Sequence, residues 1–393
     1  MRLSDHRRYL LGLIGPKADA QLAEQLDDGD WQTVNAMAAQ HRIQPWLHAQ
    51  IERGLLDIAA PGAIREDWRQ AHRRTALRAL AMRRDLLEAN TLLTANGITS
   101  VALKGAWCAW HAYAAAAERP MRDIDLLVPQ AQALEAFDLL IGAGFRQEEA
   151  SARTPEQSLV HDKHLPPLLS PQGHRFELHM RLWERDAAIG WPMPDDASTG
   201  MYARATRTDV DPVRYLAGED MLAHFVVHGV YSNRLNGGPL SLLDVDFLLR
   251  AKPIDWPDFW QSAGERGWAK GATLLLTLVD HWCGSAWCEQ AGCPHPVETE
   301  LIDSSPDLLL QDLEERKAVG LATHLSTNIG SAAKRLSGKD RATEAGGGMP
   351  DTSESRIGWL TRRLRESAKA LAKPDVRKAA GKTVRLGQWL EGE

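Results

Sequence analysis

The chain has 393 residues, is 44% hydrophobic and carries a formal charge of -6. This length allows two or three domains with ordinary cores, and the four cysteines exclude a small disulfide-stabilised fold. No run approaches the roughly 18 apolar residues that a membrane span needs, and residues 1–20 lack the apolar core and cleavage site of a signal peptide. We therefore expect a soluble, cytoplasmic protein.

Residues 1–97 carry the pattern of helices. In the stretch "DWQTVNAMAAQHRIQPWLHAQI", apolar residues recur at three- and four-residue steps from Val34 to Ile51. A longer helical pattern runs from Ala63 to Gly97, where Asn96 and Gly97 stop it. The pattern predicts an all-helical N-terminal region.

Residues 98–190 change to a mixture of strands and helices. The segments "ITSVAL" (98–103) and "DIDLLV" (123–128) are short, apolar and bounded by Gly or Pro, which is typical of strands. Helices are expected after the first strand, from Gly105, and in "QAQALEAFDLLIGAGF" (130–145). Further strands are expected around "SLVHD" (158–162) and "HRFELHMRL" (174–182). This order predicts an α/β core within a mostly helical, α+β chain.

From about Pro212 the helical period returns, which predicts a helical C-terminal domain over residues 212–330. Residues 337–356 are polar and Gly-rich, as expected for a flexible linker. Residues 357–393 are expected to form a basic helical tail, since residues 331–393 hold 14 Lys and Arg against 8 Asp and Glu. The charge pattern indicates a basic tail on an acidic body.

The D-x-D spelling occurs twice, as Asp123 with Asp125 and as Asp244 with Asp246. On a strand, residues i and i+2 project from the same face, with Cα atoms about 6.5 to 7 Å apart. On a helix the same spacing turns roughly 200°, so the side chains diverge. The first pair lies in a predicted strand and the second in the helical pattern "LSLLDVDFLLRA". Only the first pair is expected to converge.

Two convergent carboxylates raise each other's pKa unless a cation lies between them. Mg²⁺ fits this requirement, because it prefers one or two protein carboxylates together with substrate phosphates. Two such ions about 3.5 to 4 Å apart can hold the attacking and the leaving oxygen of a phosphoryl transfer. The alternative interpretation is a surface strand edge with two solvated acids.

Three neighbouring features favour the metal site. Lys104 and Gly105 stand at a strand-to-helix turn, where backbone N–H groups can bind a phosphate. Arg119 is a candidate bidentate phosphate contact, although it could equally be a solvated loop arginine. Glu177 alternates with apolar residues on a predicted strand, so it could join the pair as a third metal ligand or as the proton acceptor.

The succession "VALKGAW", "ERPMRDIDLLVP", a helix ending "GAGF" and "FELHMRLW" resembles the uncharacterised nucleotidyltransferase family of the DNA polymerase beta-like superfamily. Flanking stretches such as "AAQHRIQPWLHAQI" and "DMLAHFVVHG" are similar to that family's helical flanks, so the resemblance spans roughly residues 1–275. It implies a polymerase beta-like mixed sheet with helices, flanked by helical regions.

The resemblance also implies roles for individual residues. Gly105 would form the phosphate-binding turn, Asp123 and Asp125 would bind two Mg²⁺ ions, with Mn²⁺ as a substitute, and Glu177 would be the third acid. Many superfamily members have a small hydroxyl residue after the turn glycine, where this chain has Ala106; Lys104 and Arg119 would take over its phosphate contact. Arg122 stands where a small residue is commoner, and it could pair with Asp123 or face a substrate phosphate.

The implied activity is Mg²⁺-dependent transfer of a nucleoside monophosphate from a nucleoside triphosphate, ATP among the candidates, to an acceptor hydroxyl, with release of pyrophosphate. A metabolite, peptide or protein acceptor is favoured, because relatives are often found in biosynthetic gene clusters. One alternative is tRNA modification of the toxin type, which the basic tail would suit. Another is a catalytically silent protein that binds a nucleotide or a partner protein.

Other groups of potential ligands carry weaker signals. His179 shares a strand face with Glu177 and could contact the nucleotide or the acceptor. His224 and His228 have helical metal spacing but no third ligand in register, which favours a core role. A zinc site is disfavoured in "HWCGSAWCEQAGCPH", because four-residue gaps between cysteines are unusual for zinc. Buried thiols are the preferred interpretation there for Cys283, Cys288 and Cys293, and also for Cys108.

Overall fold

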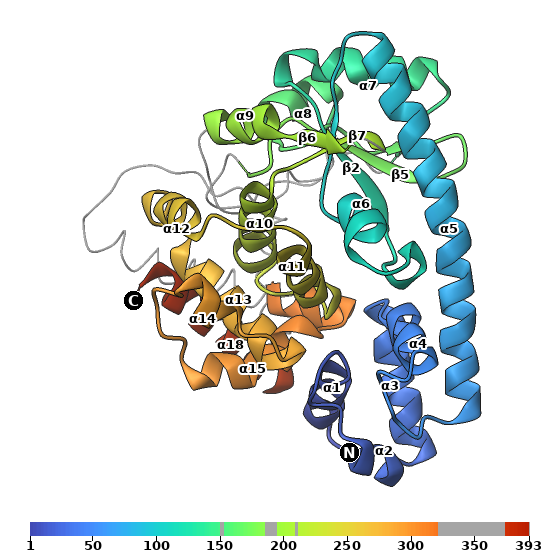
Figure 1. Ribbon diagram of the computed structural model, residues 1–393, viewed down its shortest axis with the longest axis vertical. Coiled ribbons are helices and arrows are strands. Elements are labelled where there is room, and N and C mark those ends of the chain that lie inside the picture. The colour runs from blue at the N-terminus through green and yellow to red at the C-terminus, as the bar shows by residue number, and fades with distance from the viewer. Residues whose placement is uncertain (150–152, 185–194, 209–210, 321–373, 393) are drawn as a thin grey trace, which may run out of the picture.

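The computed structural model describes residues 1–149, 153–184, 195–208, 211–320 and 374–392 (Figure 1). The predicted linker, residues 337–356, lies outside the described residues, as does the first part of the predicted tail. Within the part that is described, helices predominate and the strands form one mixed sheet. The expected α+β architecture is therefore confirmed.

The N-terminal region is helical, as predicted. Asp27 begins one of its helices by accepting a hydrogen bond from the Asp30 amide, which satisfies a free N–H of the first turn. The longest helix, α5, runs along one side of the molecule, past both the N-terminal helices and the sheet (Figure 1). The helices are α1 (Leu3–Gly12), α2 (Ala20–Gln25), α3 (Asp28–Gln40), α4 (Gln44–Glu52) and α5 (Gly62–Ala95).

Seven strands of the described residues form one sheet in the order β3-β4-β5-β2-β1-β7-β6. β2 pairs parallel with β5 and antiparallel with β1, and β1 pairs parallel with β7, so the sheet is mixed. The strands are β1 (Val101–Ala102), β2 (Asp123–Leu127), β3 (Arg146–Gln147), β4 (Leu168–Leu169), β5 (Arg175–His179), β6 (Thr206–Thr208) and β7 (Asp211–Tyr215).

The centre of the sheet is the parallel pair β2 and β5. Ile124 and Leu126 of β2 and Phe176 and Leu178 of β5 are almost completely buried. Burial of these alternating side chains fixes the register, because a slip of one residue would turn them to the opposite face. In this register Asp125 lies directly opposite Glu177.

The expected strand at residues 158–162 is wrong, because these residues belong to helix α8 (Pro155–His161) and the turn after it. The Thr154 hydroxyl accepts a hydrogen bond from the Gln157 amide, and the Gln157 side chain accepts one from the Thr154 amide. This capping box, with Pro155 at the first helical position, starts a helix where hydrophobicity alone suggested a strand.

Strands β6 and β7 were not predicted, and the segment after Pro212 begins in β7 rather than in a helix. Their sequences, "TRT" and "DPVRY", contain charged residues and a proline, which are uncommon in strands. Pairing with β1 holds β7 in the sheet, so tertiary contacts override the local pattern.

Short helices connect the strands. The helix expected after Gly105 is present as one α-turn, α6, followed by a π-helical turn over Cys108–Ala112. The amphipathic helix predicted before Phe145 is α7, whose apolar face packs against α5 and β5. The connecting helices are α6 (Gly105–Trp107), α7 (Ala133–Gly142), α8 and α9 (Asp195–Arg204).

After β7 the described chain is helical. Gly267, which has a positive φ of 75°, lies between α12 and α13 and separates the two helices. The described part of the tail forms α18, which packs on α15 through an ion pair between Arg385 and Glu298 of 2.8 Å. The helices are α10 (Gly218–Val226), α11 (Leu240–Ala251), α12 (Trp256–Glu265), α13 (Ala269–Cys283), α14 (Trp287–Ala291), α15 (Thr299–Leu309) and α18 (Pro374–Glu391).

Throughout the described part of the chain, each helix is either too short or too polar for a bilayer span.

Candidate active site

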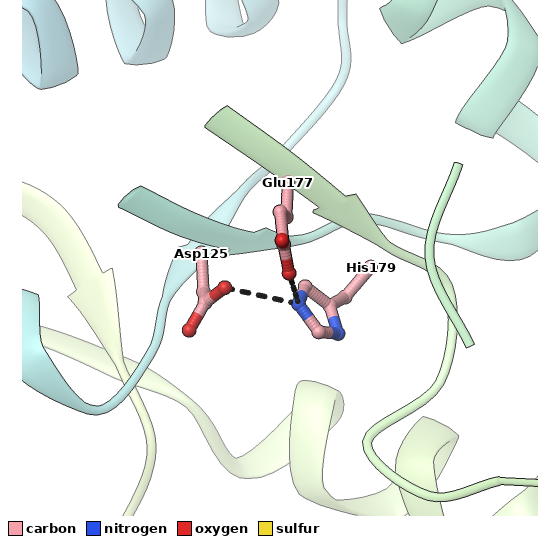
Figure 2. Close-up of side chains that lie close together, drawn as sticks. All are labelled: Asp125, Glu177 and His179. Atoms are coloured by element: carbon pink, nitrogen blue, oxygen red, sulfur yellow. Dashed lines mark hydrogen bonds and ion pairs between the residues drawn. The ribbon is translucent and has the colours of Figure 1, made fainter. Parts of the chain in front are cut away.

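Three ionisable side chains from the central strands meet at one point of the sheet (Figure 2). His179 places its Nε2 3.1 Å from Oδ1 of Asp125 and 3.6 Å from Oε2 of Glu177. One potential ligand atom from each of the three lies within 4.8 Å of the other two. The parallel register of β2 and β5 therefore brings together residues that are far apart in the sequence.

The two carboxylates of the D-x-D pair on β2 have different surroundings. Burial raises the pKa of Asp125, but the nearby charge of Lys104 and the hydrogen bond from His179 outweigh it, so the pKa lies well below its usual value. Burial, together with the charges of Asp125 and Glu177, raises the pKa of Asp123. Asp123 is thus the carboxylate whose negative charge is least compensated by the protein.

Glu177 and His179 are electrostatically linked on β5. Burial lowers the pKa of His179, but its hydrogen bonds to Asp125 and Glu177 outweigh burial and raise it overall. Burial raises the pKa of Glu177, and the hydrogen bond from His179 reverses this, so the pKa of Glu177 is lowered. His179 Nε2 therefore lies between two carboxylates, a position that also suits a cation.

The turn between β1 and α6 brings a lysine to the carboxylates. Lys104 has a φ of 39°, which is costly for a residue other than glycine. Its Nζ lies 3.1 Å from Oδ2 of Asp125. The strained turn thus directs the Lys104 side chain toward Asp125. The sequence predicts that the same side chain contacts a substrate phosphate.

Gly105 lies against the side chain of Arg119. A Cβ atom at this position would stand 2.7 Å from Nη1 of Arg119 and 3.2 Å from its Cζ. The guanidinium cannot easily move away, because two hydrogen bonds hold it to Asp244. The glycine is therefore required for packing, whatever its part in phosphate binding.

We predict that Gly105→Ala destabilises the protein by about 1–3 kcal/mol, the usual cost of overpacking a tight site. The measurement is the midpoint of urea unfolding. Gly142→Ala is a matched control, because a Cβ there would have no neighbour within 4 Å. Equal midpoints for the two variants would show that the space around Gly105 is not limiting.

Arg119 is paired with the second D-x-D copy. Its Nε lies 3.0 Å from Oδ1 of Asp244, and its Nη2 lies 2.5 Å from Oδ2. Burial lowers the pKa of Arg119, but the charge of Asp244 outweighs it and raises the pKa overall. The phosphate contact predicted for Arg119 stays a prediction, and such a contact would have to share the guanidinium with Asp244.

Asp244 and Asp246 diverge on α11, as the sequence predicted. Asp244 faces Arg119, whereas Asp246 accepts hydrogen bonds from the Ser285 hydroxyl and from the Trp287 indole. Both carboxylates are buried. The same D-x-D sequence therefore makes separate buried contacts on α11 and contributes to a cluster of acids on β2.

A cleft of about 650 Å³ connects these groups. The strand carboxylates lie in its wall together with Lys104, Gly105, Arg119, Arg122 and His179, so all the predicted site residues face one space. Residues from the flanking helical regions complete the lining. Those that the sequence interpretation missed include Arg42, Lys163, His164 and Arg316.

His164 and Lys163 could have been found from the polar stretch "HDKHLP", which follows α8. Nε2 of His164 lies 3.7 Å from Glu177, and its ring packs against His179 with centroids 5.2 Å apart. The sequence prediction missed both residues because it assigned residues 158–162, directly before Lys163, to a strand. Arg42 and Arg316 have no comparable local signal.

Among the weaker candidates, His228 lines the same cleft, whereas His224 and the cysteines are not part of its lining. His224 is buried and His228 is partly buried, and desolvation with the nearby charge of Lys104 holds the pKa of each well below its ordinary value. The expected burial of the thiols holds for Cys108 and is wrong for Cys283, Cys288 and Cys293, which are partly exposed. Sulfur atoms of Cys288 and Cys293 lie 2.6 Å apart. Across the residues that the structure describes, Asp125, Glu177 and His179 form the one group of three with the spacing of metal ligands.

The donor set fits a hard divalent cation. Carboxylate oxygens suit Mg²⁺ and Mn²⁺, and the imidazole of His179 adds a donor that Mn²⁺ accepts more readily than Mg²⁺. Asp123 was predicted as a ligand and lies outside the group formed with His179. Its partly compensated charge beside Asp125 and Glu177 nevertheless favours a cation at the same point.

Comparison with known proteins gives one match. The family described as uncharacterised nucleotidyltransferase matches residues 27–284. The chain belongs to this family. No curated protein and no solved structure matches it.

The nucleotidyltransferase segment contains the whole sheet and all the predicted site residues. It also includes most of the N-terminal helical region and the helices through α13. Helices α15 and α18 and residue Arg316 lie beyond it. The family assignment therefore covers the chemistry of the central strands, while part of the cleft wall comes from outside the matched segment.

Proposed function

We propose that this nucleotidyltransferase moves a nucleoside monophosphate from a nucleoside triphosphate to a hydroxyl group of an acceptor, with divalent cations and release of pyrophosphate. The observation that supports this most directly is the in-register pairing of β2 with β5, which aligns Asp125 with Glu177 beside a cleft. Acids from adjacent strands are the arrangement that metal-assisted phosphoryl transfer needs.

Asp123, Asp125 and Glu177 are the proposed ligands of two Mg²⁺ ions. When bound, the cations would supply charge stabilisation for the attacking oxygen and for the leaving pyrophosphate. Lys104 would neutralise a phosphate, and backbone N–H groups at Gly105 would donate hydrogen bonds to it. Glu177 is either a metal ligand or the group that accepts the proton of the attacking hydroxyl. His179 and Arg122 would contact the nucleotide or the acceptor.

A metabolite or peptide acceptor is preferred to tRNA. In the described part of the tail, Lys382 and Arg385 pair with acidic residues of the α15 region, so these two charges are already used within the protein. A catalytically silent protein would have no need to keep one buried and two partly buried acids beside an accessible cleft, because such a group costs stability.

The experiment is a calorimetric titration of Mg²⁺ with each of the four nucleoside triphosphates. We expect metal-dependent binding by the wild-type chain, and a loss of affinity of about 100-fold or more in Asp125→Asn, since even residues behind a metal ligand contribute about 10- to 100-fold. Asp138→Asn, which removes an exposed carboxylate on α7, should bind as the wild type does.

Absence of metal-dependent nucleotide binding in the wild-type chain would refute the proposed function. Pyrophosphate release then separates the acceptors, with a metabolite and peptide extract in one arm and bulk tRNA in the other. Release that occurs with tRNA alone would replace the preferred acceptor class by the toxin-like alternative.

A further inference from the structure

Three arginines from distant parts of the chain line the same cleft as the strand carboxylates. Arg42 follows α3, Arg122 directly precedes β2, and Arg316 lies in the helical stretch 313–320. In the described part of the chain, no acidic residue forms an ion pair with any of the three. The buried Nε of Arg42 also has no hydrogen-bond partner. Among the described residues these arginines therefore have no ion-pair partner, although the charges of Asp123 and Asp244 also act on Arg42.

The electrostatics indicate that Arg42 and Arg316 each lie near Arg122. Burial, with the charges of Arg122 and Arg119, lowers the pKa of Arg42 to about 10. Burial and Arg122 also lower the pKa of Arg316. Since like charges repel, this arrangement costs free energy until an anion binds between the arginines.

The surroundings hold the arginines in place without neutralising them. Arg42 has a φ of 58°, a backbone conformation that is uncommon outside glycine, and lies directly after the buried His41. Nη2 of Arg316 donates to the carbonyl oxygen and to the side-chain oxygen of Asn236, at 3.0 and 2.6 Å. Asn236 therefore orients a guanidinium without cancelling its charge.

Phosphate is the anion that this cluster fits best. Guanidinium groups bind phosphate oxygens through paired N–H donors, and a phosphate monoester carries close to two negative charges at neutral pH. Three arginines that lack an ion-pair partner among the described residues match this doubly charged group better than they match a single carboxylate. Neutral side chains in the same lining, among them Gln40, Asn233 and Ser241, could complete its hydrogen bonds.

Position indicates which substrate carries the phosphate. Lys104 and the Gly105 turn adjoin Asp125, where the nucleotide phosphates are expected under the proposed function. Arg42 and Arg316 instead belong to the helical regions that precede and follow the sheet along the chain, and Arg316 lies beyond the segment that matches the family. We propose that Arg42, Arg122 and Arg316 form a second anion subsite, which binds a phosphate group of the acceptor. This proposal rests on the proposed function.

The test is titration of inorganic phosphate into the full-length chain, first alone and then saturated with Mg²⁺ and an α,β-methylene analogue of each nucleoside triphosphate. We expect phosphate to bind in both cases. Arg42→Gln and Arg316→Gln should each weaken binding by about 10- to 100-fold, the effect of losing a charged hydrogen bond. Arg74→Gln, an exposed arginine on α5, controls for the change of net charge.

Two results would overturn the proposal. One is unchanged phosphate affinity in Arg42→Gln and Arg316→Gln variants whose circular dichroism matches that of the wild type. The other is loss of phosphate binding once the nucleotide analogue is bound, which would assign the arginines to the nucleotide's own phosphates. If no analogue binds, the proposed function fails instead, and titration of the nucleotide-free chain still tests the subsite.

Discussion

Replacing Arg119 by methionine is expected to lower the free energy of unfolding by about 3–5 kcal/mol, the usual cost of removing one partner of a buried ion pair. The side chain of Asp244 is only 4% exposed, so its carboxylate would remain buried without a cationic partner, although it keeps the hydrogen bond from the Tyr113 hydroxyl. Urea unfolding of the wild-type chain and Arg119→Met measures the difference.

Arg250→Met is a matched control, because Arg250 pairs with an aspartate of α11, the helix that also carries Asp244. Arg250 pairs with the equally buried Asp246, but the Arg250 side chain is 55% exposed and Asp246 keeps hydrogen bonds from Ser285 and Trp287. Its loss should therefore cost about 1 kcal/mol or less. The double variant Arg119→Met with Asp244→Leu should recover part of the lost stability, because no charge is then left buried without a partner.

The same measurement decides what Arg119 does. If Arg119→Met unfolds at the urea concentration of the wild type but loses nucleotide binding, the guanidinium serves a phosphate, as the sequence suggested. If stability falls while nucleotide affinity per folded molecule is kept, the arginine positions α11 and the Gly105 turn. Loss of both would mean that the residue joins the second D-x-D copy to the nucleotide site.

The sequence predicted the central strands because local patterns decide them. In β2 and β5, apolar residues alternate with charged or polar ones, and the same D-x-D sequence in α11 is surrounded by apolar residues at helical steps. Periodicity alone therefore predicts that Asp123 and Asp125 converge and that Asp244 and Asp246 diverge. That Glu177 lies on the strand beside β2 depended on the family resemblance, since spacing along the chain does not specify strand order.

What the sequence did not predict depends on contacts between distant residues or on capping. Nothing around Arg42 or Arg316 distinguishes them from ordinary surface arginines, and their significance comes from meeting Arg122 in the folded chain. Strand β7 forms because β1 is available to pair with it. Helix α8 had a local signal in Thr154 and Gln157, which the hydrophobic pattern of the next residues concealed.

Asp123→Asn is expected to abolish nucleotidyl transfer while stabilising the ligand-free protein. The transfer rate should fall by about 10³-fold or more, because a lost metal ligand removes several kcal/mol of transition-state stabilisation. The melting temperature without metal should rise, since the substitution removes a partly buried negative charge that lies near Asp125 and Glu177. Pyrophosphate release and thermal unfolding in EDTA measure the two effects.

Adding Mg²⁺ should reverse the order of stability. A cation that binds only the folded state raises the melting temperature of the wild-type chain in proportion to its affinity, and Asp123→Asn should lose most of that increase. Asp138→Asn, which removes an exposed carboxylate, should follow the wild type with and without metal. If Asp123→Asn instead melts below the wild type in EDTA, the carboxylate is already stabilised by the protein, and the electrostatic argument for a cation beside it fails. The empty site would thus lower the stability of the folded protein, and bound metal would restore it. Such a site favours binding of metal and nucleotide before transfer.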